Sequence, residues 1–340
     1  MLRIEGLEVR KGNFILQVDH FEVQTHEFIS ILGPSGSGKT TFLEAIAGFS
    51  PLKKGKILFY GNDITGLPPW ERNVAIIYQE AYLFPHFTVW KNLLYGKRAC
   101  ADFVRNIAGK LNISDLLDRF PNELSAGQRQ RVSIARAIAT RPLILLMDEP
   151  FNFLDPINKE DFRSLVKEIR ESFLMPMILV THDLEEALYY ADRVAIIREG
   201  KIVGVDTPYS LVKRPEDDFV AQFTGRANFL PIEKKGERYF LGSVEINLPE
   251  RVNRDRFVVM IRPQDIIISD AEPQHSSARN HLKGRIVEVR PGSKVNEVKV
   301  EVDGITLVVF ITDASREELN LQPGMEVYLV FKATALHIFD

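Results

Sequence analysis

One eight-residue segment, GPSGSGKT at 33–40, restricts the fold more than any other part of the 340-residue sequence. It follows the apolar run EFISILG and precedes KTTFLEAIAG, whose apolar residues recur at helical spacing. Glycines let the backbone curl so that successive N–H groups point inward, and a helix N-terminus adds partial positive charge. The pattern G-x-x-x-x-G-K-[ST] between a strand and a helix therefore predicts a phosphate-binding loop in an α/β fold.

The side chains of this loop suit a nucleoside triphosphate and its metal ion. Lys39 can reach the β- and γ-phosphates, and the Thr40 hydroxyl can ligate Mg²⁺. We therefore expect ATP and Mg²⁺ as cofactors. The alternative, an accidental glycine-rich turn, is disfavoured by the strand–loop–helix context. The residues expected to line the nucleotide site are Gly33, Pro34, Ser35, Gly36, Ser37, Gly38, Lys39, Thr40 and Thr41.

Three more apolar runs end in polar side chains suited to hydrolysis. PLILLMDEP ends in two acids, Asp148 as the natural Mg²⁺ ligand and Glu149 as a general base that polarises water. His182, in LVTHD, could contact a γ-phosphate, although a lone histidine is more often structural. Gln79, in AIIYQE, carries an amide that can orient water and ligate Mg²⁺. Solvated acids at a strand end are the alternative for the carboxylates.

A change in the pattern of apolar residues along the chain predicts two domains. Residues 1–228 alternate apolar runs with helical patterns, which indicates a mainly parallel sheet covered by helices. Residues 229–340 instead alternate apolar and polar positions, and Asp303-Gly304 between two such runs is a hairpin signal. We expect a small all-β barrel there.

Composition excludes few classes of protein. The net charge of -3 gives no argument for nucleic acid as a partner. The single cysteine, Cys100, excludes an intramolecular disulfide and favours a reducing compartment. The N-terminus lacks the apolar core of a signal peptide, and the longest apolar runs are too short to span a bilayer. We expect a soluble chain whose membrane role, if any, comes through a partner.

LSAGQRQR at 124–131 makes the set of motifs specific. GPSGSGKT, YQE, LSAGQ, LLMDEP, FLDP and THD occur in the order and approximate spacing of ABC-transporter ATPase subunits, which residues 1–228 resemble. The resemblance implies an α/β P-loop NTPase domain, an ATPase at the cytoplasmic side of the cell membrane and two transmembrane permease subunits as partners. It also implies a head-to-tail homodimer with each ATP between one phosphate loop and the partner's signature.

Further roles follow from this resemblance alone. Ser125, Gly127 and Gln128 belong to the signature, whose serine and second glycine contact the γ-phosphate across the dimer. Asp155 bridges the two sites, and Gln79 links the nucleotide state to the permease. The aromatic segment AYLFPHFTVW (81–90) resembles the surface that receives a cytoplasmic permease helix, with ordinary core packing as the alternative.

Three positions depart from the family pattern. Ala126 replaces the first glycine of LSGGQ, which would cost about 1 kcal/mol if that position needs a positive φ. Lys11 stands where an aromatic residue usually stacks on adenine, and Phe14 is the nearest substitute. Asn152-Phe153 replaces the usual Ser-Ala, which could change how tightly the dimer closes.

The C-terminal part resembles an oxyanion-binding domain of the Mop or TOBE type, an OB-like barrel with a regulatory role. The resemblance covers SSARNHLKGRIVEV, VNEVKVEV, FITDASREELNL and PGMEVYLVFKATALHI. A tetrahedral oxyanion such as molybdate or tungstate offers only acceptors, so it needs several converging donors. The alternative is a basic loop entering a strand. The residues that the resemblance assigns to the anion are Ser277, Ala278, Arg279, Asn280, Lys332, Ala333 and Thr334.

These resemblances together imply the energy-coupling ATPase of a molybdate or tungstate importer, inhibited by oxyanion bound to its C-terminal domain. An external oxyanion-binding protein would be an indirect partner. The alternatives are an importer of sulfate, thiosulfate or sugar, and an oxyanion store or sensor with a degenerate ATPase. An ABC ATPase acting on DNA or ribosomes is disfavoured, because the chain lacks a coiled-coil insertion and a second ATPase domain.

Overall fold

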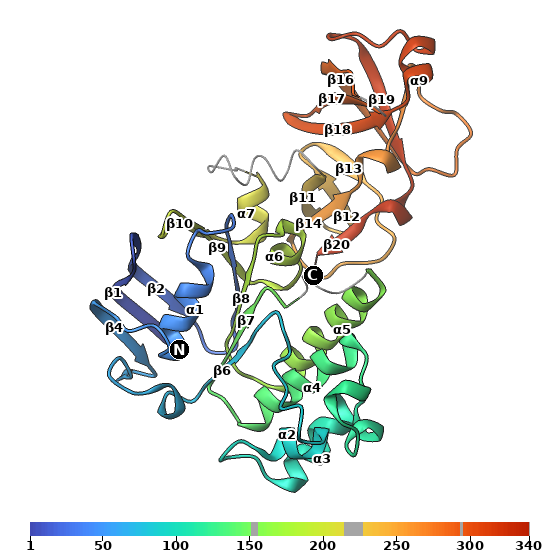
Figure 1. Cartoon of the computed structure of the whole chain (residues 1–340). Coiled ribbons are helices and arrows are strands. Elements are labelled where there is room, and N and C mark those ends of the chain that lie inside the picture. Colours follow the sequence, from blue (N-terminus) through green and yellow to red (C-terminus); the bar gives the residue numbers. More distant parts are fainter. Residues whose placement is uncertain (151–155, 214–226, 293–294, 340) are drawn as a thin grey trace. The chain divides into compact units, whose positions relative to one another are not determined.

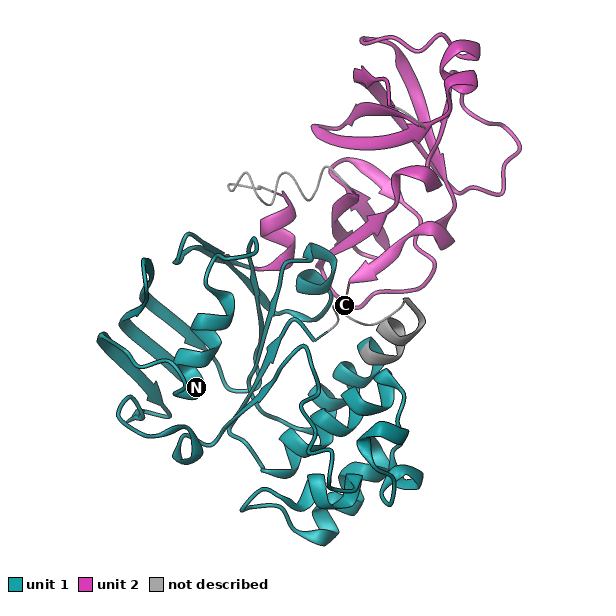
Figure 2. Cartoon of the chain, viewed as in Figure 1, with its two compact units in different colours: residues 1–206 teal, residues 207–340 magenta. Residues whose placement is uncertain are grey.

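The computed structural model describes residues 1–150, 156–213, 227–292 and 295–339, with the backbone alone over 156–162. It divides into two compact units, residues 1–206 and 207–340 (Figure 2). The sequence pattern changes near residue 228, whereas the division by contacts comes earlier. The reason is that helix α7 (Pro208–Lys213) packs on two strands of the second unit. Tyr209 of this helix donates a hydrogen bond to Glu233 at 2.5 Å.

The first unit is built on one ten-stranded sheet. Its strands are β1 (Leu2–Lys11), β2 (Phe14–Val23), β3 (Phe28–Leu32), β4 (Lys54–Phe59), β5 (Asn62–Asp63), β6 (Val74–Ile77), β7 (Ile144–Asp148), β8 (Met177–Thr181), β9 (Arg193–Arg198) and β10 (Lys201–Asp206). Their order is β5-β4-β1-β2-β10-β9-β3-β8-β7-β6. The helices are α1 (Lys39–Ala47), α2 (Val89–Leu94), α3 (Ala101–Lys110), α4 (Ala126–Ala139), α5 (Pro156–Ser172) and α6 (Leu184–Tyr190), with 3-10 turns η1 (Pro69–Glu71), η2 (Ser114–Leu116) and η3 (Pro121–Glu123).

Only one half of this sheet is parallel. β9, β3, β8, β7 and β6 pair in parallel, and every residue of β3, β7 and β8 is buried, as expected for strands covered on both faces. β1, β2 and β4 pair antiparallel, so the prediction of a mainly parallel sheet is too simple. A two-residue turn with Gly12 at φ 58° joins β1 to β2 and fixes their register, with Lys11 opposite Phe14.

Helices α2 and α3 pack on α4, which in turn contacts β6 (Figure 1). α5 shows the predicted apolar face where its side chains are described, since Leu165, Val166 and Ile169 are buried. Helix α4, which begins directly after the LSAGQ serine, therefore joins α2 and α3 to the sheet.

The second unit is all-β apart from short helices, which confirms the predicted class. Its strands are β11 (Asn228–Lys235), β12 (Arg238–Leu241), β13 (Val244–Ile246), β14 (Arg256–Ile261), β15 (Ile267–Ser269), β16 (Asn280–Arg290), β17 (Asn296–Val302), β18 (Ile305–Ile311), β19 (Glu326–Phe331) and β20 (His337–Phe339). Besides α7, the described residues of this unit include the short helices η4 (Pro263–Asp265), α9 (Asp313–Glu318) and η5 (Ala333–Ala335).

These strands form two antiparallel sheets, β13-β12-β11-β14-β20 and β15-β19-β16-β17-β18, which share one apolar core. The predicted hairpin is present, because Val302 pairs with Ile305 across Asp303 and Gly304. Both turn residues have positive φ, 50° and 79°, which is the geometry that favours Asp-Gly in a two-residue turn.

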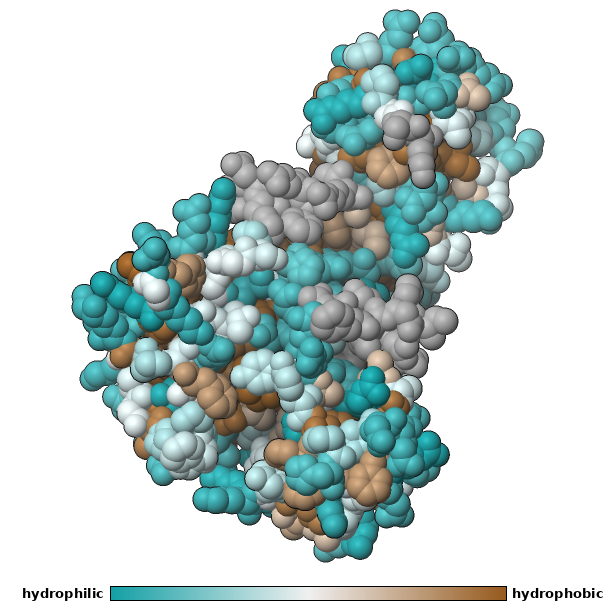
Figure 3. All heavy atoms as spheres, viewed as in Figure 1, coloured by the Kyte–Doolittle hydropathy of each residue, from teal (hydrophilic) through white to brown (hydrophobic). Residues whose placement is uncertain are grey.

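On the face drawn in Figure 3, apolar side chains lie in separate patches among polar ones. Among the described residues, none of the helices combines the length and the apolar character that crossing a bilayer would require.

Candidate functional site

The phosphate loop lies where the sequence predicts it, between β3 and α1. Gly33 must be glycine, since a Cβ there would lie 2.3 Å from the carbonyl oxygen of Ile197. Gly38 has φ 104° and precedes the first turn of α1. The Phe14 ring packs on this glycine, because a Cβ at Gly38 would lie 2.7 Å from its Cζ atom. Phe14 is half-buried, so this ring supports the loop from the side of β2.

Lys39 holds its ammonium group inside the loop. The residue is 5% exposed, and Nζ donates to the carbonyl oxygens of Gly33 at 2.9 Å and Pro34 at 3.1 Å. The same Nζ lies 3.4 Å from Oε1 of Glu149. The loop therefore contains a buried positive charge of the kind that phosphate binding requires.

Asp148 and Thr40 meet at the end of β7. Thr40 Oγ1 donates to Asp148 Oδ1 at 3.1 Å. Asp148 is 8% exposed, and burial raises its pKa, with the nearby Glu149 carboxylate adding to the shift and the Thr40 hydrogen bond opposing it. A buried carboxylate beside a hydroxyl is an oxygen donor set that suits Mg²⁺.

Glu149 lies between the loop and His182. Its φ of 45° is uncommon for a residue with a side chain, and its N–H donates to the carbonyl oxygen of Val180 on β8 at 3.0 Å. Nδ1 of His182 lies 3.0 Å from Oε2 of the carboxylate. β7 and β8 are parallel neighbours, so their carboxyl ends bring both side chains to one edge of the sheet.

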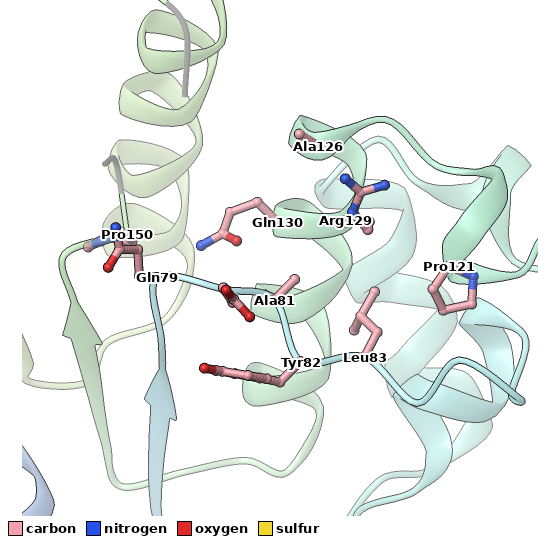
Figure 4. A pocket seen from close by; sticks show the side chains of 10 residues that line it. Gln79, Ala81, Tyr82, Leu83, Pro121, Ala126, Arg129, Gln130 and Pro150 are labelled. Carbon is pink, nitrogen blue, oxygen red and sulfur yellow. The ribbon is translucent and has the colours of Figure 1, made fainter. Parts of the chain in front are cut away.

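Gln79 follows β6 at the same edge and lines a pocket of about 390 Å³. This pocket separates the segment 79–83 from the start of α4 (Figure 4). Its walls are Gln79, Glu80, Ala81, Tyr82, Leu83, Pro121, Ala126, Arg129, Gln130 and Pro150. Gln79 therefore lies between two elements. One is the edge of the sheet next to the nucleotide loop, and the other is helix α4, which carries the signature.

The signature forms the start of α4. Ser125 is the N-cap, and its hydroxyl accepts a hydrogen bond from the Gln128 N–H at 3.2 Å. The Gln128 side chain returns a bond, accepting from the Ser125 N–H at 3.0 Å. Ala126 opens the helix and is absent from the described residues with positive φ, so the cost considered for an alanine there does not arise. Gly127 is half-buried in the first turn.

Three sequence positions lie outside what can be described. Asn152, Phe153 and Asp155 fall in the gap at 151–155. At the other departure, Lys11 forms an ion pair with Glu44 of α1. The position that usually carries an aromatic residue therefore carries an ion pair to the helix behind the loop.

The aromatic segment after Gln79 is only partly core. Tyr82 is 63% exposed, while Phe84 and Phe87 are half-buried and lie 5.6 Å apart between ring centres. Two polar residues that sequence reasoning missed hold this segment. Asn92 is fully buried and bonds to Phe84 through both its N–H and its carbonyl, and Arg136 bonds to carbonyls at 81 and 82. A buried asparagine on the apolar face of α2 was the available signal for the first.

The predicted oxyanion residues form two adjacent segments in the second unit. Asn280 pairs with Phe331, so 277–279 lies beside 332–334 where β16 begins and β19 ends. The side chains that stay exposed are Ser277, Arg279, Lys332 and Thr334, while Ala333 is half-buried.

Two of the predicted donors in these segments are already engaged. The Asn280 side chain is buried, accepts from the Asn247 N–H at 2.7 Å and donates to the Asn247 carbonyl at 3.0 Å. The Ala278 N–H donates to Ser276 Oγ at 3.0 Å.

Comparisons with known proteins agree with this geometry. Residues 16–152 match the model of the ABC transporter family, and residues 276–338 match that of the TOBE domain. The chain is 40% identical, over the full length of both chains, to the molybdate/tungstate import ATP-binding protein WtpC of Pyrococcus horikoshii. It is 34% identical to the sulfate/thiosulfate import ATP-binding protein CysA 2 of Chromobacterium violaceum, over 95% of this chain and 90% of that protein.

A solved structure is similar to the first unit. It is the dimeric post-hydrolysis state of the ATP-binding cassette MJ0796 bound to ADP and phosphate, with 25% identity and a TM-score of 0.54. The similarity covers 61% of this chain and 99% of that one. With a nucleotide loop, a paired acid–histidine edge, an LSAGQ helix and a full-length match at 40% identity, the chain belongs to the ATP-binding import subunits of ABC transporters, which couple ATP hydrolysis to transport.

Proposed function

We propose that this ATPase energises import of molybdate or tungstate. The observation that carries this choice of substrate is the 40% identity, along the whole chain, to a protein named for molybdate/tungstate import. A sulfate/thiosulfate subunit follows at 34%, so sulfate is the second candidate. The three anions share one demand, which is a set of converging hydrogen-bond donors without soft ligands.

Hydrolysis depends on the cluster around Glu149. The contacts to Lys39 at 3.4 Å and His182 at 3.0 Å fix both carboxylate oxygens. Glu149 takes a proton from water as the water oxygen bonds to the γ-phosphorus, and the bond from that phosphorus to the ADP oxygen breaks. Lys39 offsets negative charge on the phosphates, and His182 orients the carboxylate. Most of the catalysis is therefore positioning and charge stabilisation.

A divalent cation fits beside this cluster. Thr40 and Asp148 already bring two oxygens together at 3.1 Å, and Asp148 is a buried carboxylate whose charge a cation would offset. With Gln79 they would hold Mg²⁺, which supplies charge against the phosphate oxygens when bound. The backbone N–H groups of residues 33–41, which all but Pro34 supply, would contact the phosphates.

Two copies of the chain would complete the reaction site. A dimeric relative of the first unit supports this arrangement. Ser125 and Gly127 of one copy would contact the γ-phosphate held by the loop of the other, with Gln128 fixing the serine through their mutual hydrogen bonds. The dimer would act at the cytoplasmic face of the membrane with two permease subunits, and an external oxyanion-binding protein would supply the cargo.

The second unit would sense the cargo. Arg279 and Lys332 add exposed positive charge to adjacent segments, and Ser277 and Thr334 add hydroxyl donors. Because one chain joins an ATPase to this surface, bound oxyanion would favour one arrangement of the subunits and lower ATP turnover. It can do so only through different affinities for the two arrangements.

Calorimetry of the full chain against molybdate, tungstate and sulfate tests the anion preference. We expect molybdate and tungstate to bind at least tenfold more tightly than sulfate. Arg279→Met should weaken binding about tenfold, whereas Lys283→Met, which removes a cation paired with Glu326 at 2.9 Å, should leave it unchanged. Equal or tighter sulfate binding would refute the substrate assignment, and no binding of any anion would refute the sensor.

A further inference from the structure

Helix α4 connects the signature residues to the segment that follows Gln79. It begins with the signature residues, and Arg136 lies nine residues after Gly127. At 1.5 Å per residue this separation is about 14 Å along the helix axis. A displacement of the helix start therefore moves Arg136 as well, because an α-helix of this length behaves as one rigid element.

The guanidinium group of Arg136 binds the segment that follows Gln79. One terminal nitrogen, Nη1, donates to the carbonyl oxygen of Tyr82 at 2.9 Å, and Nη2 donates to that of Ala81 at 3.4 Å. The guanidinium also lies over the Phe84 ring, 5.5 Å from its centre. Three contacts from one planar group fix the position and the orientation of the segment relative to α4.

The backbone at Tyr82 has an unfavourable conformation that contacts of this kind can stabilise. Its φ is 39°, in the left-handed region that residues with side chains seldom adopt, and its side chain is 63% exposed. Burial of the tyrosine therefore does not explain the conformation. On the far side, Asn92 fixes the Phe84 backbone with bonds of 2.9 and 3.2 Å. The segment 81–84 is thus held between α4 and α2, with its strained residue on the α4 side.

A second side chain of α4 lies beside the pocket next to this segment. Gln130 is 4% exposed, and its Nε2 atom has no hydrogen-bond partner among the described residues. Figure 4 shows this amide directed across the pocket toward Gln79 and Pro150. A buried donor without a partner costs about 1–3 kcal/mol. The pocket leaves space beside this amide for a displacement of α4.

We propose that Arg136 is a positioning residue that carries nucleotide-driven displacement of α4 to the segment 81–84. The proposal rests on the proposed function in one respect, namely that Ser125 and Gly127 contact ATP in the dimer. It adds the physical link from that contact to the aromatic surface, through carbonyl hydrogen bonds of a single arginine.

Hydrogen exchange of the full chain, read by mass spectrometry, tests the link. The Glu149→Gln variant is used as the background so that Mg·ATP is held without turnover. Two peptides are followed, one covering 79–87 and one covering 124–131, with and without Mg·ATP. In this background we expect ATP to change exchange in both peptides.

Arg136→Met should separate the two responses. We expect exchange of 79–87 to rise about tenfold and to lose its response to ATP, while 124–131 still responds. Arg105→Met is the matched control, since Arg105 also stacks on an aromatic ring, Trp90, at 5.2 Å, and should leave both responses intact. If Arg136→Met does not fold by circular dichroism, Arg136→Lys, which keeps the charge but not the fork of donors, should show a partial loss.

The outcomes test the composite ATP site and the role of Arg136 separately. If 124–131 does not respond to ATP in the background variant, the composite ATP site is wrong and the proposal falls with it. If 124–131 responds and the ATP response at 79–87 survives in the arginine variant that folds, the composite site stands and the role of Arg136 is refuted.

Discussion

Asp148→Asn should make the nucleotide-free protein more stable while abolishing hydrolysis. The wild-type carboxylate is 8% exposed, and burial raises its pKa. Asparagine has nearly the same shape and can still accept the Thr40 hydrogen bond that is now 3.1 Å long. Removing the buried charge should stabilise the chain by about 1 kcal/mol, the scale that single stabilising substitutions commonly reach. For a unit of this size that is roughly 2–4 °C in Tm.

Mg·ATP should reverse the order of stability, so that the wild type becomes more stable than the Asp148→Asn variant. At a ligand concentration of about one hundred times Kd, binding stabilises the wild-type chain by roughly 2.7 kcal/mol. The variant loses the carboxylate that would hold the cation, so most of this increment should disappear. Thermal melts with and without Mg·ATP should therefore cross, with the variant higher alone and the wild type higher with the ligand.

The pH dependence has a definite sign. The folded-state pKa of Asp148 lies above its ordinary value of 3.8, so the penalty for the buried charge is complete only above the raised pKa. As pH falls through the raised pKa toward 3.8, the wild-type residue protonates in the folded state and the penalty fades. The stability difference between variant and wild type should shrink over this range. A variant less stable at pH 7 without ligand, or a difference independent of pH, would refute the reasoning.

Three more predictions follow from named contacts. Glu149→Gln should bind ATP and remain a closed dimer by gel filtration, with turnover reduced at least a hundredfold; turnover near the wild-type rate would exclude Glu149 as the base. Ala126→Gly should lower the free energy of unfolding in urea by up to about 1 kcal/mol without raising ATP turnover, because the residue opens a helix. Gln130→Met should raise the Tm of the nucleotide-free chain by roughly 2–4 °C, since it removes a buried donor that has no partner in the described part of the chain; a lower Tm would show that the amide is satisfied.

The nucleotide site could be predicted because its parts obey a simple rule of parallel sheets. Lys39, Asp148, Glu149 and His182 each follow an apolar run, and the carboxyl ends of neighbouring parallel strands meet at one edge. Local sequence therefore determines which side chains converge, even though Lys39 and Asp148 are more than 100 positions apart. The C-terminal hairpin at Asp303 was predictable for a related reason, since the turn chemistry is local.

Two features of the structure lie outside the sequence-based predictions, for different reasons. The β1–β2 hairpin does carry a local signal, the alternation of buried residues and a Gly12 turn. The hydrogen bonds from Arg136 to the carbonyl oxygens of residues 81 and 82 have no local signal in the sequence. They span more than 50 positions and use backbone carbonyls, which any residue supplies. Contacts of this kind depend on how helices pack, which periodicity does not specify.

In the C-terminal segment, the contacts of Asn280 differ from those expected of a free anion donor. The family resemblance assigned Asn280 to an oxyanion, yet its amide is buried and paired with both backbone groups of Asn247. Asn228 makes the same reciprocal pairing with Val308, at 2.8 and 2.6 Å. Each of these buried amides joins backbone segments distant in the sequence. For Asn280 to bind an anion directly, its pairing with Asn247 would have to break, and two backbone groups would lose their partner. The proposed sensor therefore depends on the exposed donors at 277, 279, 332 and 334, with Asn280 holding the segment that presents two of them.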